Sequence, residues 1–196
     1  MNKMHKNSML QNPQAYPDMD YLDSEAAQSR CMIAAHVMRL CPHVVEIGGF
    51  TTPISLFLTG HHESVTVIDP LMRAYSSDQL NGYPCKVQHV PEPFQQARLN
   101  MKGEYGFVML GASLKHFSED PKLKEQEWAI LVEMISGAQV SVIEAAIDWP
   151  LGRGALDKLL EIPNIRIRTS IDLDLSANPG MDRDHYRRRL LVLEPV

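Results

Sequence analysis

Apolar positions along this chain follow two spacings, and segments of the two kinds take turns. Short apolar runs predict buried strands, whereas apolar residues three or four positions apart predict amphipathic helices. The pattern predicts strands over about 43–47, 64–68, 85–90, 107–110, 140–144, 165–175 and 185–194. It predicts helices over about 24–40, 53–59, 71–80, 92–101, 121–136 and 152–161, after an irregular polar leader over residues 1–22. Strands that alternate with helices indicate an α/β fold with a mostly parallel sheet.

The last two strands have a different pattern from the earlier ones. Apolar and polar residues alternate strictly over about 165–175, which is typical of a strand with one wet face at a sheet edge. No helix separates this strand from the final one, so the two must pair antiparallel. We therefore expect one domain over residues 23–196, a three-layer sandwich around a seven-stranded, mostly parallel sheet whose last strand is antiparallel.

The first candidate chemistry lies in the segment 44–69. A buried strand leads into Gly48 and Gly49, a helix start follows, and the next strand ends at Asp69. This order builds a nucleotide crevice, because the glycines let backbone approach a ligand and a carboxylate can accept from both ribose hydroxyls. Asp69 follows Gly48 at close to the offset of about 20 residues that is expected of a ribose-binding acid.

The glycine spacing then narrows the type of nucleotide. The chain has neither the G-x-G-x-x-G of a dinucleotide site nor the G-x-x-x-x-G-K-[ST] of a P-loop. Glu46 stands two residues before Gly48, where a carboxylate would repel a pyrophosphate and attract a cation. This triplet resembles the first motif of class I S-adenosylmethionine (SAM) methyltransferases, acid-x-Gly-x-Gly-x-Gly, although Phe50 and Thr52 stand at the second and third glycine positions. An ordinary strand-turn-helix unit with a buried glutamate is the alternative.

The expected layout, β/α units closed by an antiparallel hairpin, also resembles this Rossmann-like family, and the resemblance covers about residues 24–196. It implies a SAM site with the methionine end against Glu46, Gly48 and Gly49 and the ribose on Asp69. It also implies that the adenine lies beside the end of the third strand and the methyl group beside the segment after the fourth. Those two segments supply the further candidates Val90, Pro91, Glu92, Gly111 and Ser113.

Methyl transfer from a sulfonium needs mainly alignment of donor and acceptor, because the electrophile is already activated. A general base helps only where the acceptor must lose a proton. His116 is the first candidate, because it follows the fourth strand and titrates near neutrality, with a surface or capping histidine as the alternative. Asp148, just past the fifth strand, is the second. No metal is expected, because the adjacent His61 and His62 have no carboxylate or cysteine partner at metal-ligand spacing.

The composition limits which substrates and which cellular compartment are expected. The net charge of −5 and the scattered basic residues make nucleic acid a less expected substrate than a small molecule. No apolar run reaches the roughly 18 residues of a membrane span, and no secretory signal pattern occurs. The three cysteines form no C-x-x-C pair, so we expect free thiols in a cytoplasmic protein.

The sequence thus predicts a SAM-dependent methyltransferase that acts on a small molecule. The alternative is a methyltransferase-like SAM-binding protein that transfers no methyl group, either a partner subunit or an enzyme that uses SAM as the aminopropyl and aminobutyl transferases of this fold do. Glu46 and Asp69 favour the enzyme, whereas Phe50 and Thr52 favour the alternative. We expect the Phe50 ring to pack against the body of the domain and leave room for the cofactor.

Overall fold

The computed structural model describes residues 25–50, 52–97, 104–174 and 187–196, so the expected leader over 1–22 lies outside the described residues. The helices are α2 (Glu25–Met38), α3 (Pro121–Ser136) and α4 (Pro150–Leu159), and the 3-10 turns are η3 (Ile54–Leu56) and η4 (Leu114–His116). The strands are β1 (His43–Ile47), β2 (Ser64–Ile68), β3 (Tyr75–Leu80), β4 (Tyr83–Val90), β5 (Tyr105–Leu110), β6 (Val140–Ala146), β7 (Ile165–Asp174) and β8 (Arg187–Pro195).

The described strands form one eight-stranded sheet in the order β3-β4-β2-β1-β5-β6-β8-β7. The strands from β4 to β6 in this order are parallel, whereas β8 runs antiparallel to both of its neighbours. This confirms the expected α/β class and the antiparallel close, with one strand more than the seven predicted. The alternating segment became β7, which lies at the sheet edge as predicted and leaves Ile167 48% exposed.

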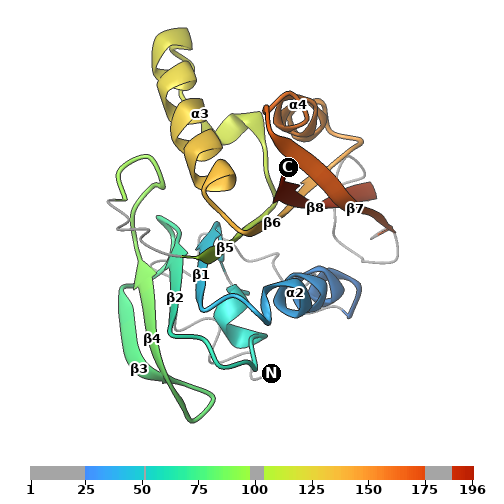
Figure 1. Ribbon diagram of the computed structural model, residues 1–196. Coiled ribbons are helices and arrows are strands. Elements are labelled where there is room, and N and C mark those ends of the chain that lie inside the picture. Colours follow the sequence, from blue (N-terminus) through green and yellow to red (C-terminus); the bar gives the residue numbers. More distant parts are fainter. Residues whose placement is uncertain (1–24, 51, 98–103, 175–186) are drawn as a thin grey trace.

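Helices cover both faces of the sheet, which gives the three layers (Figure 1). Successive residues of a strand point to opposite faces. Val44 of β1 and Val108 of β5 therefore pack with α2 and η3, whereas Val45 and Phe107 pack with α3 and α4. Two apolar cores result, one on each face, and the sheet between them is buried where β1, β5 and β6 lie side by side.

The helix predicted over 71–80 is wrong. Residues 75–80 form β3, which pairs antiparallel with β4 across a two-residue turn of Asn81 and Gly82. Both turn residues have positive φ, 52° and 84°, as a type I′ hairpin turn requires, and Asn-Gly is its preferred sequence. The Asn81 side chain also donates to the carbonyl of Leu58 at 2.7 Å, which anchors the turn.

The helix predicted over 53–59 is also wrong, because only the short turn η3 forms there. Pro53 has ψ of 148°, so it stays extended before η3 instead of opening an α-helix. Residues 92–97 form no helix either, and the end of that predicted helix, 98–101, lies outside the described residues. The helix predicted over 152–161 forms two residues earlier, because Pro150 occupies its first turn. The predicted helices 24–40 and 121–136 are confirmed.

Candidate active site

A cavity of about 570 Å³ opens at the carboxyl ends of the central parallel strands. Open α/β sheets bind ligands at this edge, and the volume is in the range of small-molecule sites. Segments that follow five strands contribute to its wall, together with α2. Its lining residues include Arg30, Glu46, Gly48, Gly49, Phe50, Asp69, Leu71, Pro93, Phe94, Gln95, Gly111, Ala112, Lys115, His116, Ala146, Trp149 and Arg188.

The turn after β1 brings backbone to the cavity. A Cβ on Gly49 would lie 2.5 Å from Cγ1 of Val67 and 2.9 Å from Oε2 of Glu46, so a side chain here would displace the acid. Phe50 has φ of +43°, in the left-handed region that glycine favours. The turn therefore keeps a glycine-like backbone although Phe50 stands where the family motif has a glycine. Phe50 lines the cavity, and the direction of its ring stays a prediction.

Asp69 lies directly after β2 and is 6% exposed. Its Oδ1 accepts from the backbone N–H of Leu71 at 2.8 Å, and its Oδ2 accepts from that of Phe50 at 3.0 Å. Each carboxylate oxygen has a second lone pair, so both can still accept from a ligand hydroxyl. Burial raises the pKa of Asp69, and the two backbone hydrogen bonds act against this shift.

Glu46 is almost fully buried under the glycine turn, and its Oε2 accepts from the N–H of Ile54 at 2.6 Å. Burial raises the pKa of Glu46 to about 8; the Ile54 hydrogen bond lowers it, the charge of Asp69 raises it further, and Arg30 lowers it. At neutral pH the side chain therefore carries its proton. A ligand cation beside it would favour the ionised form.

His116 ends η4 and lines the cavity while remaining accessible to solvent. Its Nε2 lies 3.1 Å from the carbonyl oxygen of Gly111. A carbonyl only accepts, so this contact assigns the proton of the neutral ring to Nε2 and leaves Nδ1 as an acceptor. Loss of water lowers the pKa of His116; the Gly111 hydrogen bond raises it, Lys115 lowers it and Asp69 raises it. Its ring is therefore neutral at pH 7.

The residues predicted to flank the adenine are not part of the cavity wall. Val90, Pro91 and Glu92 do not line the cavity, and its wall is formed by residues 93–95 instead. The carbonyl of Val90 accepts from the N–H of Asp69 at 3.1 Å, so the end of β4 supports the acid from behind.

Two further predicted residues have other partners. Ser113 is buried, and its hydroxyl accepts from the N–H of Lys115 at 3.2 Å, where it caps η4. Asp148 pairs with Arg187, whose Nε lies 3.0 Å from its Oδ2, and the hydrogen bond lowers the pKa of Asp148. Neither residue lines the cavity. The structure thus gathers Glu46, Gly48, Gly49, Asp69, Gly111 and His116 there.

The sequence did not predict a buried ion cluster whose two arginines, Arg30 and Arg188, also line the cavity. Glu144, two residues before the end of β6, is fully buried and accepts from Arg30 at 3.2 Å and from Nη2 of Arg188 at 3.0 Å, with a second contact from Nε of Arg188. The run of three arginines that begins β8 could have indicated an inward-facing arginine. Strand geometry turns its middle residue to the opposite face from its neighbours, so Arg188 points inward.

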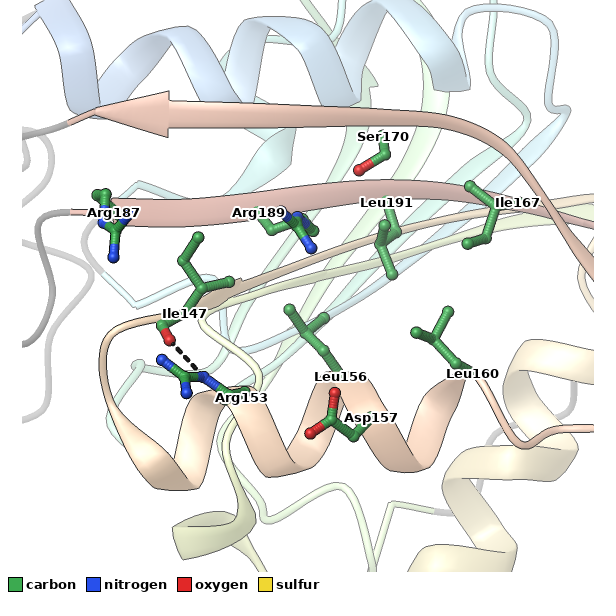
Figure 2. A pocket seen from close by; sticks show the side chains of 10 residues that line it. All are labelled: Ile147, Arg153, Leu156, Asp157, Leu160, Ile167, Ser170, Arg187, Arg189 and Leu191. Carbon is green, nitrogen blue, oxygen red and sulfur yellow. Dashed lines mark hydrogen bonds between the residues drawn. The ribbon is translucent and has the colours of Figure 1, made fainter.

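A second cavity of about 320 Å³ lies between α4 and the outer strands β7 and β8 (Figure 2). Its arginines have partners: Arg187 bonds Asp148, Arg189 bonds Asp172 at 2.7 Å, and Arg153 donates to the carbonyl of Ile147 at 2.8 Å. The carboxylates of Asp148 and Asp172 neutralise two of these three charges, and the cavity lies away from the glycine turn. The larger cavity is therefore the candidate site.

Within the described ranges, no three His, Cys, Asp or Glu side chains are grouped so that they could hold a metal ion. Among the helices of those ranges, none combines the length and apolar character needed to cross a membrane. Cys31, Cys41 and Cys85 are buried, and they form no disulfide within the described residues.

No protein-family model and no curated protein sequence matches this chain. Solved structures match it in fold. The N-methyltransferase NodS from Bradyrhizobium japonicum WM9, in complex with S-adenosyl-L-homocysteine (SAH), aligns at a TM-score of 0.61 and 14% identity, over 98% of this chain and 96% of NodS. The 1,6-didemethyltoxoflavin-N1-methyltransferase of Burkholderia thailandensis, also with bound SAH, aligns at 0.57 and 15% identity, over 91% and 81%.

A candidate RNA methyltransferase, PH1948 from Pyrococcus horikoshii, aligns at a TM-score of 0.54 and 11% identity, over 96% of this chain and 93% of that one. The chain therefore has the fold of class I SAM-dependent methyltransferases, which confirms the resemblance in the sequence at the level of the fold.

Proposed function

We propose that this protein is a SAM-dependent methyltransferase that acts on a small molecule. The observation that carries this proposal is the convergence of Glu46, the glycine turn and Asp69 on one cavity, at the ends of the adjacent strands β1 and β2. The two N-methyltransferases that share the fold were solved with SAH, which supports the choice of cofactor. One of them also holds the small molecule 1,6-didemethyltoxoflavin.

In this proposal, polar side chains, the backbone of the glycine turn and an apolar wall together bind SAM. The free lone pairs of Asp69 accept from the ribose hydroxyls, and the backbone of Gly48 and Gly49 meets the methionine tail. Glu46 faces the ammonium group of that tail and ionises when the cation arrives. Pro93 and Phe94 supply an apolar wall for the adenine.

His116 is the proposed proton acceptor. The cofactor supplies an activated methyl group, so the protein's task is to align the acceptor and to remove its proton where it has one. The contact with Gly111 holds the His116 ring through Nε2, which leaves the Nδ1 lone pair to take that proton. Asp148 lies outside the cavity in its pair with Arg187, so the proposal gives it no role in this step.

Isothermal titration calorimetry with SAM and SAH tests this function directly, with NAD and ATP as controls. We expect SAM and SAH to bind and the two phosphate-bearing nucleotides to fail, because a carboxyl group and not a phosphate cradle lies at the glycine turn. Absence of SAM and SAH binding by the folded protein would overturn the proposal.

A further inference from the structure

The turn η4 places a cation next to the proposed proton acceptor at the cavity wall. Lys115 and His116 are consecutive residues of this turn, and both are exposed and line the cavity. Two contacts hold their backbone. The hydroxyl of Ser113 accepts from the N–H of Lys115 at 3.2 Å, and the side chain of Gln95 donates to the carbonyl of His116 at 2.9 Å. The two side chains therefore start from a fixed backbone.

The Lys115 ammonium group forms no ion pair with any residue that the structure describes. It lies over an aromatic ring instead, with its Nζ 5.0 Å from the centre of the Trp149 ring. An ammonium group carries three donors, and a ring face offers them no oxygen acceptor. A negatively charged oxygen of a ligand in the cavity would supply one.

His116 is a weak base. Loss of water lowers its pKa below 6.5; the Gly111 hydrogen bond raises it, Lys115 lowers it and Asp69 raises it. Transfer of a proton to a weak base is efficient only where the donor is itself acidic. A phenol, with a pKa of about 10 as in tyrosine, is a far stronger acid than an aliphatic alcohol. A cation beside its oxygen lowers that pKa further.

The same cation argues against an amine as the acceptor. An aliphatic amine enters the site as a cation at neutral pH, and Lys115 would repel it. The residues directly before the turn, Gly111 and Ala112, are small and line the cavity together with Ala146 and Trp149. Such a wall has room for the flat apolar body of an aromatic or enolic acceptor.

We propose that Lys115 binds the reacting oxygen of the methyl acceptor as an anion, so that the substrate carries an acidic hydroxyl, as a phenol or an enol does. The hydroxyl proton passes to Nδ1 of His116. The acceptor oxygen then bonds to the methyl carbon while the bond from that carbon to sulfur breaks and leaves its electron pair on sulfur. The products are a methyl ether and SAH, and His116 returns its proton to water. This inference rests on the proposed function and names the substrate class of the same site.

The test uses 4-nitrophenol, whose ionised form is coloured, and the protein saturated with SAH. SAH lacks the positive charge of the sulfonium, so the effect of Lys115 is measured without it. We expect the pKa of the bound probe, read from its absorbance as pH is varied, to lie at least about one pH unit below that of the free probe. Ionised 4-nitrophenol should also bind at least about tenfold more tightly than 4-nitrobenzyl alcohol, whose hydroxyl does not ionise.

Lys115→Gln should raise the pKa of bound 4-nitrophenol by at least about one pH unit and change SAH affinity less than twofold. Lys115→Arg retains the charge and should keep the pKa of the bound probe below that of the free probe. Lys158→Gln is the matched control and should change neither the pKa of the probe nor its affinity. Lys158 also lies over an aromatic ring, with its Nζ 4.5 Å from the centre of the Trp128 ring, but it does not line the cavity.

Thermal unfolding checks that each variant folds, which we expect because the Lys115 side chain is exposed. Three results would each overturn the inference: no binding of 4-nitrophenol to the SAH complex, equal affinity for the two probes, or a pKa of the bound probe that Lys115→Gln leaves unchanged. A tenfold loss of SAH affinity in Lys115→Gln would assign the cation to the cofactor and equally overturn it. Failure of the proposed function would show separately, because the unaltered protein would then not bind SAH.

Discussion

Glu46 combines deep burial with a position beside the glycine turn, and this sets how its protonation is coupled to folding. Burial raises its pKa in the folded state to about 8, from 4.5. Between these values the folded protein holds a proton that the unfolded chain has lost, so the free energy of unfolding falls as pH rises. The loss is complete above pH 8, where both states are ionised.

Glu46→Gln should remove this dependence. We expect the unfolding free energy of the variant, relative to that of the unaltered protein, to increase as pH rises from about 5 to about 8. The increase is at most about 1.4 kcal/mol per pH unit. Denaturant unfolding at a series of pH values measures both proteins under the same conditions. Parallel stability curves would show that Glu46 titrates normally in the folded state.

His116 should be found neutral, with its proton on Nε2. The carbonyl of Gly111 fixes this tautomer, and loss of water holds the pKa of His116 below its ordinary value of 6.5. Long-range proton–nitrogen NMR spectra of the imidazole, recorded as a function of pH, measure both properties. A proton on Nδ1, or a pKa above 6.5, would contradict the proposed arrangement for accepting a proton.

At the scale of elements, local sequence patterns predicted the strands better than the segments that connect them. The runs that became β1, β2 and β6 are apolar enough to be buried whatever lies next to them, and α3 has an apolar stripe between clear caps. Asn81-Gly82, by contrast, is compatible with a helix end and with a hairpin turn. Pairing with β4 decided between them, and sequence spacing alone does not show that pairing.

Ser76 tests the strand assignment, because strands and helices rank its replacements in opposite order. Ser76 is exposed on β3 opposite Gln88. In a strand, Ser76→Thr should be more stable than Ser76→Ala by a few tenths of a kcal/mol to about 1 kcal/mol, because β-branched residues favour strands. A helix would reverse the order by roughly 0.5 kcal/mol. Chemical denaturation of the two variants gives the sign.

At the scale of the whole molecule, the sequence predicted the part of the site that one continuous segment carries. Glu46, Gly48 and Asp69 belong to one strand-turn-strand unit, so their spacing is visible in the chain. The arginine cluster is different, because Arg30 and Arg188 lie 114 and 44 residues from Glu144. Only the sheet order brings them together, and it places cations in the cavity of a chain whose net charge is −5.

The central claim, that Asp69 holds the ribose of SAM, is tested most directly by calorimetric titration of SAH into Asp69→Ala. A hydrogen bond to a charged group contributes about 1.5–3 kcal/mol, and each 1.4 kcal/mol is about a factor of ten, so we expect at least a tenfold loss of affinity. Asp172→Ala, which removes an exposed carboxylate paired with Arg189, is the control and should bind SAH within twofold of the unaltered protein. Thermal unfolding shows whether Asp69→Ala stays folded without its bonds to Phe50 and Leu71. A folded Asp69→Ala that binds SAH as tightly as the unaltered protein would contradict the account.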